Sequence, residues 1–286
     1  MKESEIGALI RLLDDPDTSI SDHIYAKLLE LGTVSTPYLE NAWETSKNSV
    51  FQKKIEQLIH QIQFQSTSNN LKTWIKEESI NLLKGMTVIA QYHYPSIHIE
   101  DIEKKIDLIA HDVWLEISED LTPLEKVKVL NHIIYDIHGF EANAINFHAP
   151  ENSFLNIVLD SKKGNPLTLS VIYSLVAQKV FIPIFGINLP EHFILGYKNT
   201  KENITFLDEN LILFYINAFN KGSVFTRKEI ELFIKELKIE SKEYYYSPCT
   251  NIDIVKRLLN NLMLSFKNQA DYIRENEIKA LIELFD

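Results

Sequence analysis

Apolar residues recur every three or four positions through the first 65 residues, the spacing that places them on one face of a helix. One helix is expected around Ile6–Leu13 and a second around Ile24–Leu31. Gly32 closes the second helix, and further helices are expected over residues 34–43 and 50–62. This part of the chain is therefore predicted to be helical throughout.

The first helices, joined by the polar turn Asp14–Asp17, resemble one unit of a HEAT-type helical repeat. A repeat needs neighbours to bury its faces, so this unit is expected to cap the domain that follows. The stretch Gln65–Asn70 is polar, lacks apolar periodicity and is predicted to be a linker. The expected domains are a HEAT-like region over residues 1–65, a central domain over residues 71–238 and a helical tail over residues 250–286.

Helical spacing continues through the next part of the chain, over residues 71–89, 99–117 and 122–138. Thr122 and Glu125 are placed to form a capping box at the start of the third of these helices. A short helix over residues 154–159 and a strongly apolar one over residues 166–180 follow.

The pattern then changes to short β-type runs, expected as antiparallel strands over residues 182–189, 192–197, 204–207 and 211–216. Helical spacing returns over residues 226–237, 252–266 and 270–285. Helices and strands are thus segregated along the chain, and this order predicts an α+β fold in which a small antiparallel sheet is flanked by helices.

The net charge and the cysteine content limit which partners and which cellular compartment are expected for the chain. The formal net charge of −11 disfavours nucleic acid and anionic membrane surfaces as partners. The single cysteine, Cys249, permits no intramolecular disulfide. With no signal peptide and no apolar run of about 20 residues, the chain is expected to be soluble and cytoplasmic.

The start of the apolar helix is the place where chemistry is expected. Asn165 is a good N-cap and Pro166 suits the first helical position. In thiol hydrolases a cysteine at such a helix start has a lowered pKa. His192 and Asp208 lie 16 residues apart on neighbouring predicted strands, so a carboxylate could orient an imidazole at the end of the sheet.

An ordered set of motifs resembles the SirB family of transglutaminase-like proteins over roughly residues 71–284. The motifs are Gly139-Phe140, Asn152-Ser153, Val158-Leu159, Gly164-Asn165-Pro166 and Leu189-Pro190-Glu191-His192-Phe193. The resemblance implies a papain-like core and a tail resembling part of a tetratricopeptide unit, which the run Arg257–Leu262 matches. The family usually has glycine where this chain has Glu191, a departure that could alter the turn beside His192.

By this resemblance, the three positions of a catalytic triad are Pro166, His192 and Asp208, with proline where the nucleophile should be. Proline cannot act as a nucleophile, so transamidation and thiol proteolysis are not expected. The candidate ligand-binding residues are Asn165, Glu191, His192, Asp208 and Asn152.

Ordinary structural roles are expected for the other candidate residues. Cys249 has no evident basic neighbour, and Ser170, one turn after Pro166, lacks the flanking glycines of a nucleophile elbow. His132 and Asp136 are read as a surface pair and not as metal ligands. The eight glycines form no phosphate-binding pattern, so no metal and no cofactor are expected.

Three functions remain open. The favoured hypothesis is a non-catalytic transglutaminase-like protein that binds a polypeptide or a small polar ligand in the ancestral cleft. A regulatory or scaffold protein would instead bind a protein partner through its helical repeats, with the cleft closed. A hydrolase would use His192 and Asp208 to activate water. An open pocket at Asn165 and His192 favours the first hypothesis, and a filled one favours the second.

Overall fold

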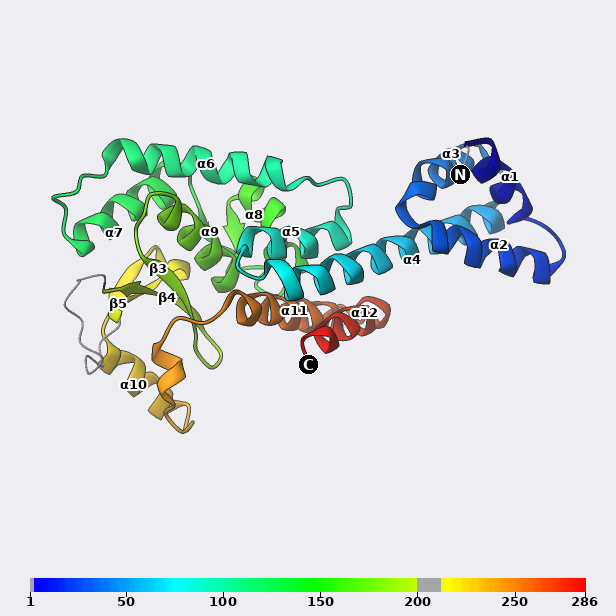
Figure 1. The fold of residues 1–286 in the computed structure, drawn as a ribbon. Helices are drawn as coiled ribbons and strands as arrows, with labels where there is room; N and C mark the ends of the chain where they lie inside the picture. The colour runs from blue at the N-terminus through cyan, green and yellow to red at the C-terminus, as the bar shows by residue number, and fades with distance from the viewer. Residues whose placement is uncertain (1–2, 200–211) are drawn as a thin grey trace. The chain divides into compact units, whose positions relative to one another are not determined.

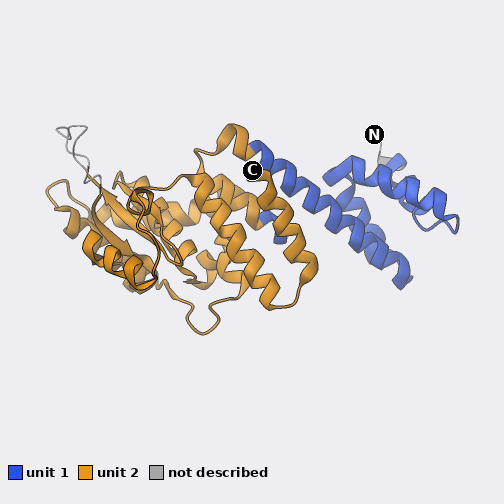
Figure 2. Ribbon diagram, turned by 90° about the horizontal axis from the view of Figure 1, so that it is seen from below, with its two compact units in different colours: residues 1–73, 91–95 blue, residues 74–90, 96–286 orange. Residues whose placement is uncertain are grey.

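The computed structural model describes residues 3–199 and 212–286. The chain divides into two units, one made of residues 1–73 and 91–95 and the other of residues 74–90 and 96–286 (Figure 2). Among the described residues, no helix combines the length and the apolar character needed to cross a membrane.

The first unit is helical, as its apolar periodicity predicted, and it has its own core. Its helices are α1 (Glu3–Leu12), α2 (Thr18–Leu31), α3 (Thr36–Thr45) and α4 (Ser49–Thr73). Asp17 caps α2 by accepting a hydrogen bond from the Ser19 amide, and Gly32 ends the helix with φ of 63°. The core is formed by isoleucines and leucines from all four helices and from the turn after α1: Ile6, Ile10, Leu13, Ile24, Leu28, Leu39, Ile55, Leu58 and Ile62.

Residues 65–70, predicted to form a polar linker, are a continuous part of helix α4. Thr67 and Leu71 are buried and lie four residues apart, so they extend the buried face that begins with Ile55. The prediction of a linker was wrong. A mostly polar stretch can still form a helix when one face of that helix is buried against its neighbours.

In the second unit, the helix expected over residues 71–89 is interrupted. A π-helical turn, Trp74–Glu78, follows α4, and α5 (Leu82–His93) begins after it. The Trp74 side chain is fully buried against Gly85, where an added Cβ would lie 2.6 Å from the indole ring. Next come α6 (Ile99–Glu116) and α7 (Pro123–Asn131), and α7 continues into a π-helical turn, His132–Ile137. The predicted capping box of Thr122 and Glu125 is present at the start of α7.

A four-stranded antiparallel sheet forms the β part of this unit, and its described strands follow the order β3-β4-β5-β6. Strands β3, β4 and β5 are labelled in Figure 1. Its strands are β3 (Ile184–Asn188), β4 (Phe193–Lys198), β5 (Ile212–Asn217) and β6 (Ser223–Phe225). The strand expected over residues 204–207 lies outside the described residues. A short parallel pair, β1 (Glu141–Ala142) with β2 (Lys163–Gly164), was not predicted. Together with the surrounding helices, the sheet confirms the α+β fold.

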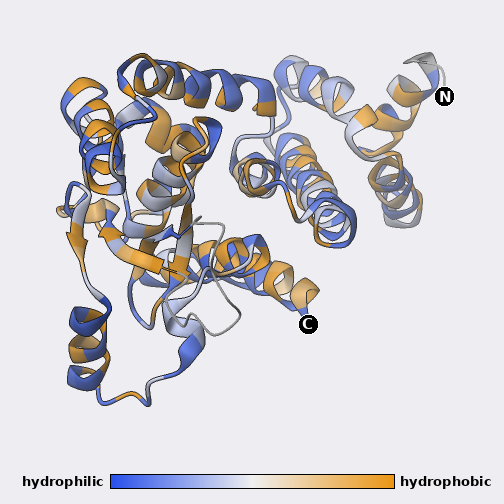
Figure 3. Cartoon of the chain, turned by 60° about the vertical axis from the view of Figure 1, so that its left-hand side comes forward, coloured by the Kyte–Doolittle hydropathy of each residue, from blue (hydrophilic) through white to orange (hydrophobic). Residues whose placement is uncertain are grey.

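Helix α9 (Pro166–Lys179) is the central helix of the second unit. Its residues from Leu167 to Ser174 are all buried, because it packs against β3 and β4 and also against α6 and the short helix α8 (Leu155–Ser161). The strands carry mostly hydrophobic residues, whereas most helices carry both kinds (Figure 3).

Three further helices complete the second unit: α10 (Arg227–Glu236), α11 (Asn251–Asn268) and α12 (Tyr272–Ile282). A separate apolar cluster joins α10 to the sheet through Ile187, Ile194, Ile230 and Ile234. Helix α11 packs against α12, β3 and the 3₁₀ turn Pro150–Ser153. This packing places one face of α11 near the start of α9.

Candidate functional site

The start of α9 has the geometry that its sequence predicted. Asn165 is the N-cap: its Oδ1 accepts a hydrogen bond of 2.9 Å from the Thr168 amide, and Pro166 is the first helical residue. The Asn165 Nδ2 donates to Ser153 Oγ over 3.1 Å. Both ends of the Asn165 amide therefore have structural partners, which fix the position of the helix start.

Asn152, a candidate ligand-binding residue, is 2% exposed, and its side chain forms structural hydrogen bonds near the start of α9. Its Nδ2 donates to the carbonyls of Asn146 and Phe147, at 2.6 and 3.1 Å, and its Oδ1 accepts from the Asn143 amide group at 2.8 Å. Asn152 thus holds the loop that carries Phe147 and His148.

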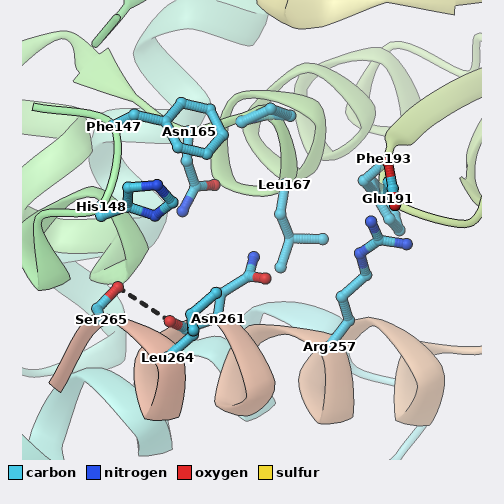
Figure 4. Close-up of a pocket in the computed structure, with 11 residues that line it drawn as sticks. Phe147, His148, Asn165, Leu167, Glu191, Phe193, Arg257, Asn261, Leu264 and Ser265 are labelled. Atoms are coloured by element: carbon cyan, nitrogen blue, oxygen red, sulfur yellow. Dashed lines mark hydrogen bonds between the residues drawn. The ribbon is translucent and has the colours of Figure 1, made fainter. Parts of the chain in front are cut away.

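A cavity of about 480 Å³ opens at the start of α9 (Figure 4). Its apolar lining comes from Phe147, Pro166, Leu167, Phe193 and Leu264. Its polar lining comes from His148, Asn165, Glu191, Arg257, Asn261 and Ser265. The candidates Asn165, Pro166 and Glu191 are brought together here, whereas Asn152 and His192 do not line the cavity.

One face of α11 forms a wall of the cavity that the site predictions did not include. Arg257, Asn261 and Leu264 follow one another at spacings of four and three residues, so they share a helix face, with Ser265 beside Leu264. Figure 4 shows Arg257 and Asn261 rising from α11 toward the level of Leu167. The sequence signal for this wall was the run Arg257–Leu262, which was interpreted only as part of a helical tail.

Arg257 joins α11 to the turn between β3 and β4. Its Nη1 donates to Asn188 Oδ1 and to the Leu189 carbonyl, each over 2.5 Å, and its guanidinium lies 5.8 Å from the centre of the Phe193 ring. Burial lowers the pKa of Arg257, although arginine stays protonated at neutral pH. No Asp or Glu among the described residues forms an ion pair with this side chain.

Glu191 occupies the tip of the same turn with a φ of 60°, in the left-handed region that favours glycine. Glycine, the residue that the resemblance implied at this position, adopts such a conformation without steric strain. Two residues later, the Phe193 ring lies over Gly186, where an added Cβ would be 2.6 Å from Cζ. The absence of a side chain at Gly186 lets Phe193 reach its place in the cavity wall.

His192 points to the other side of the sheet. Its side chain is exposed, and its ring centre lies 4.8 Å from that of Phe233 on α10. The neighbouring Ile194 belongs to the cluster that packs against α10, so alternation along the strand places His192 and Phe193 on opposite sides. Asp208 lies outside the described residues, and its pairing with His192 stays a prediction.

Cys249 does not line the cavity. Its amide donates to the Gly186 carbonyl over 2.9 Å, and burial raises the pKa of its thiol to about 12. Ser170 is fully buried in α9 and its hydroxyl has no partner among the described residues. Ser265 lines the cavity, but its hydroxyl donates to the Asn261 carbonyl at 2.9 Å and has no hydrogen bond to His148.

The described residues contain no group of three or more His, Cys, Asp or Glu side chains arranged to hold a metal ion. His132 and Asp136 form an exposed pair, with 3.1 Å between Nδ1 and Oδ2. Their spacing of four residues along the helix accounts for the contact.

Comparison with known proteins places residues 100–260 in a described family. The family model of the transglutaminase-like superfamily matches these residues. The UPF0162 protein of Xylella fastidiosa (strain Temecula1) is 30% identical over 207 residues, which covers 70% of this chain and 69% of that protein. The UPF0162 protein YchA of Escherichia coli (strain K12) is 22% identical over 204 residues, or 70% of each chain.

A longer eukaryotic protein is also similar. F-box only protein 21 of Homo sapiens is 24% identical over 239 residues, which covers 75% of this chain but 37% of that protein. The chain therefore spans little more than a third of this relative. No solved structure matches the chain.

Proposed function

The chain belongs to the transglutaminase-like superfamily, and we propose that it binds a polypeptide segment or a small polar ligand, without thiol catalysis, at the start of α9. The observation that carries this proposal is the open cavity beside Pro166, at the position where the superfamily would place its nucleophile. We also propose that the chain is a member of the SirB family within this superfamily, and that its flanking helices are repeat-like.

The chemistry of the cavity favours binding over covalent catalysis. Pro166 offers no nucleophilic atom, and the raised pKa of Cys249 keeps that thiol protonated at neutral pH. The Ser265 hydroxyl donates within its own helix and has no hydrogen bond to a base among the described residues.

The size and lining of the cavity suit a ligand. Its volume of about 480 Å³ falls in the range of roughly 300 to 1,000 Å³ typical of small-molecule sites. Its lining combines five apolar residues, among them Phe193 and Leu264, with six polar ones, among them Arg257 and Asn261. Such a lining gives affinity through apolar burial and specificity through placed hydrogen bonds.

The two other hypotheses have less support. A scaffold with a closed cleft does not need this open cavity. A hydrolase built on His192 needs its imidazole to face the bound substrate, but His192 packs beside Phe233. Neither hypothesis explains why polar groups converge at the start of α9.

A thermal-shift screen with peptides, amino acids and carboxylates tests the proposal. The variant Leu264→Trp fills the cavity at a position that is 48% exposed, and Leu115→Trp, at a 63% exposed leucine on α6, is its control. A ligand at about 100 times its Kd stabilises the native state by about 2.7 kcal/mol. We expect at least one ligand to stabilise the wild type and Leu115→Trp but not Leu264→Trp. Equal shifts in all three proteins, or none in any, would contradict the proposal.

A further inference from the structure

The cavity contains a cation, Arg257, that has no carboxylate partner in the part of the chain that the structure describes. Both hydrogen bonds of the Arg257 guanidinium use Nη1 and go to neutral oxygens, the Asn188 amide oxygen and the Leu189 carbonyl. The side chain is half-buried and forms no ion pair among the described residues. A partly desolvated guanidinium attracts an anionic group at short range, where a charge-assisted hydrogen bond can form.

A second polar group stands beside it. The Asn261 side chain lines the cavity one helical turn from Arg257, and its amide has no hydrogen-bond partner among the described residues. Figure 4 shows this amide extending from α11 into the space below Leu167. An unused amide donor next to a guanidinium matches the two oxygen atoms of a carboxylate.

We propose that the cavity binds its ligand through a carboxylate held by Arg257 and Asn261, with the apolar body of the ligand against Phe193 and Leu264. This inference rests on the proposed ligand-binding function and names the chemical class of the ligand. The apolar residues flank the two polar groups on β4 and α11, so one ligand can contact both sets.

Glu191 restricts the charge of that ligand. Its carboxylate lines the same cavity, is exposed and forms no ion pair among the described residues. A ligand with a second negative charge would be repelled by Glu191, so the site selects monocarboxylates. This role also gives a reason for an acidic side chain at a left-handed position, where glycine is less strained.

Matched acids and amides test the inference by isothermal titration calorimetry on the intact chain. The probes are N-acetylphenylalanine, N-acetylleucine and N-acetylmethionine, each paired with its neutral carboxamide. We expect at least one acid to bind, and its amide to bind at least tenfold more weakly. Amides that bind as tightly as their acids, or a panel in which no acid binds, would overturn the inference.

Variants on α11 and at the turn locate the contact. Asn261→Ala removes the proposed donor, and Asn260→Ala is the control, because Asn260 is exposed on the same helix and donates to the Lys256 carbonyl. Affinity for the acid should fall at least fivefold in Asn261→Ala, stay unchanged in Asn260→Ala and rise in Glu191→Gln. An unchanged affinity in Asn261→Ala would contradict the inference.

Two outcomes distinguish a cavity that binds ligands other than carboxylates from a cavity that binds none. If a neutral or cationic ligand binds the wild type and is blocked by Leu264→Trp while every acid is inactive, the cavity is a binding site but not for carboxylates. If neither acids, amides nor the wider panel of peptides and amino acids bind, both proposals are wrong.

Discussion

Arg257 Nη1 donates to the Leu189 carbonyl over 2.5 Å and thereby ties α11 to the turn between β3 and β4. The same nitrogen donates to Asn188 Oδ1 over the same distance. The turn carries Glu191 and leads into Phe193, so two walls of the cavity are joined by the guanidinium proposed to hold the ligand. This residue therefore has a measurable role in stability as well as a proposed role in binding.

Replacing Arg257 should destabilise the fold. Arg257→Gln loses the charge and shortens the reach of the donor, and hydrogen bonds that involve a charged group contribute about 1.5 to 3 kcal/mol. We expect a loss of about 2 kcal/mol in the free energy of unfolding, measured by urea denaturation. The control Lys256→Gln breaks a surface ion pair with Asp286 and should cost less than about 1 kcal/mol. Equal losses in both variants would show that the Arg257 contacts do not hold the turn.

Replacing Glu191 by glycine should stabilise the fold. A non-glycine residue in the left-handed region costs about 1 to 2 kcal/mol, which is partly offset by the larger entropy that glycine loses on folding. We expect Glu191→Gly to raise the free energy of unfolding by about 0.5 to 1 kcal/mol. Glu191→Ala keeps the backbone strain and removes the carboxylate, so it should bring no gain. A similar gain in both variants would assign the effect to charge and not to conformation.

Removing the N-cap of α9 should destabilise the helix start. Asn165→Ala loses the hydrogen bond to the Thr168 amide and leaves Ser153 without its donor, at a cost of about 1 to 2 kcal/mol. Asn165→Asp keeps an acceptor for the Thr168 amide and should lose less. Thermal unfolding followed by circular dichroism compares them, and equal stability of wild type and Asn165→Ala would contradict the capping role.

The thiol of Cys249 should react slowly in the native protein. Burial raises its pKa to about 12, above the value of roughly 8.5 for an unfolded cysteine. The thiol therefore keeps its proton up to a higher pH in the native state than in the unfolded state. The stability that this difference contributes is fully present below about pH 8.5 and is lost as the pH rises toward 12. At pH 8, we expect a disulfide reagent to modify the native thiol at least about tenfold more slowly than the urea-unfolded thiol. Equal rates would contradict the burial of Cys249.

Local signals in the sequence predicted much of the second unit. The apolar spacing over residues 99–117 predicted α6 to within one residue, and Asn165 with Pro166 predicted the start of α9. Strands β1, β2 and β6 are two or three residues long, too short for an alternating pattern to emerge. Their pairing depends on contacts between distant segments, which periodicity does not encode.

The candidate site was predicted in part. Asn165, Pro166 and Glu191 belong to motifs and lie at the cavity. Arg257 and Asn261 were missed because they sit in a helix whose other residues form an ordinary apolar face, and only tertiary packing brings that helix to α9. His192 was expected near the cavity, but the side of the sheet that it faces depends on strand register.

The most direct test of ligand binding at the start of α9 is saturation-transfer difference NMR with the same panel of peptides, amino acids and carboxylates. Wild type, Leu264→Trp and the control Leu115→Trp are compared under one condition. We expect at least one ligand to receive saturation from the wild type and from Leu115→Trp, and the signal to disappear with Leu264→Trp. Signals that persist with Leu264→Trp, or a panel that gives none with the wild type, would contradict this expectation.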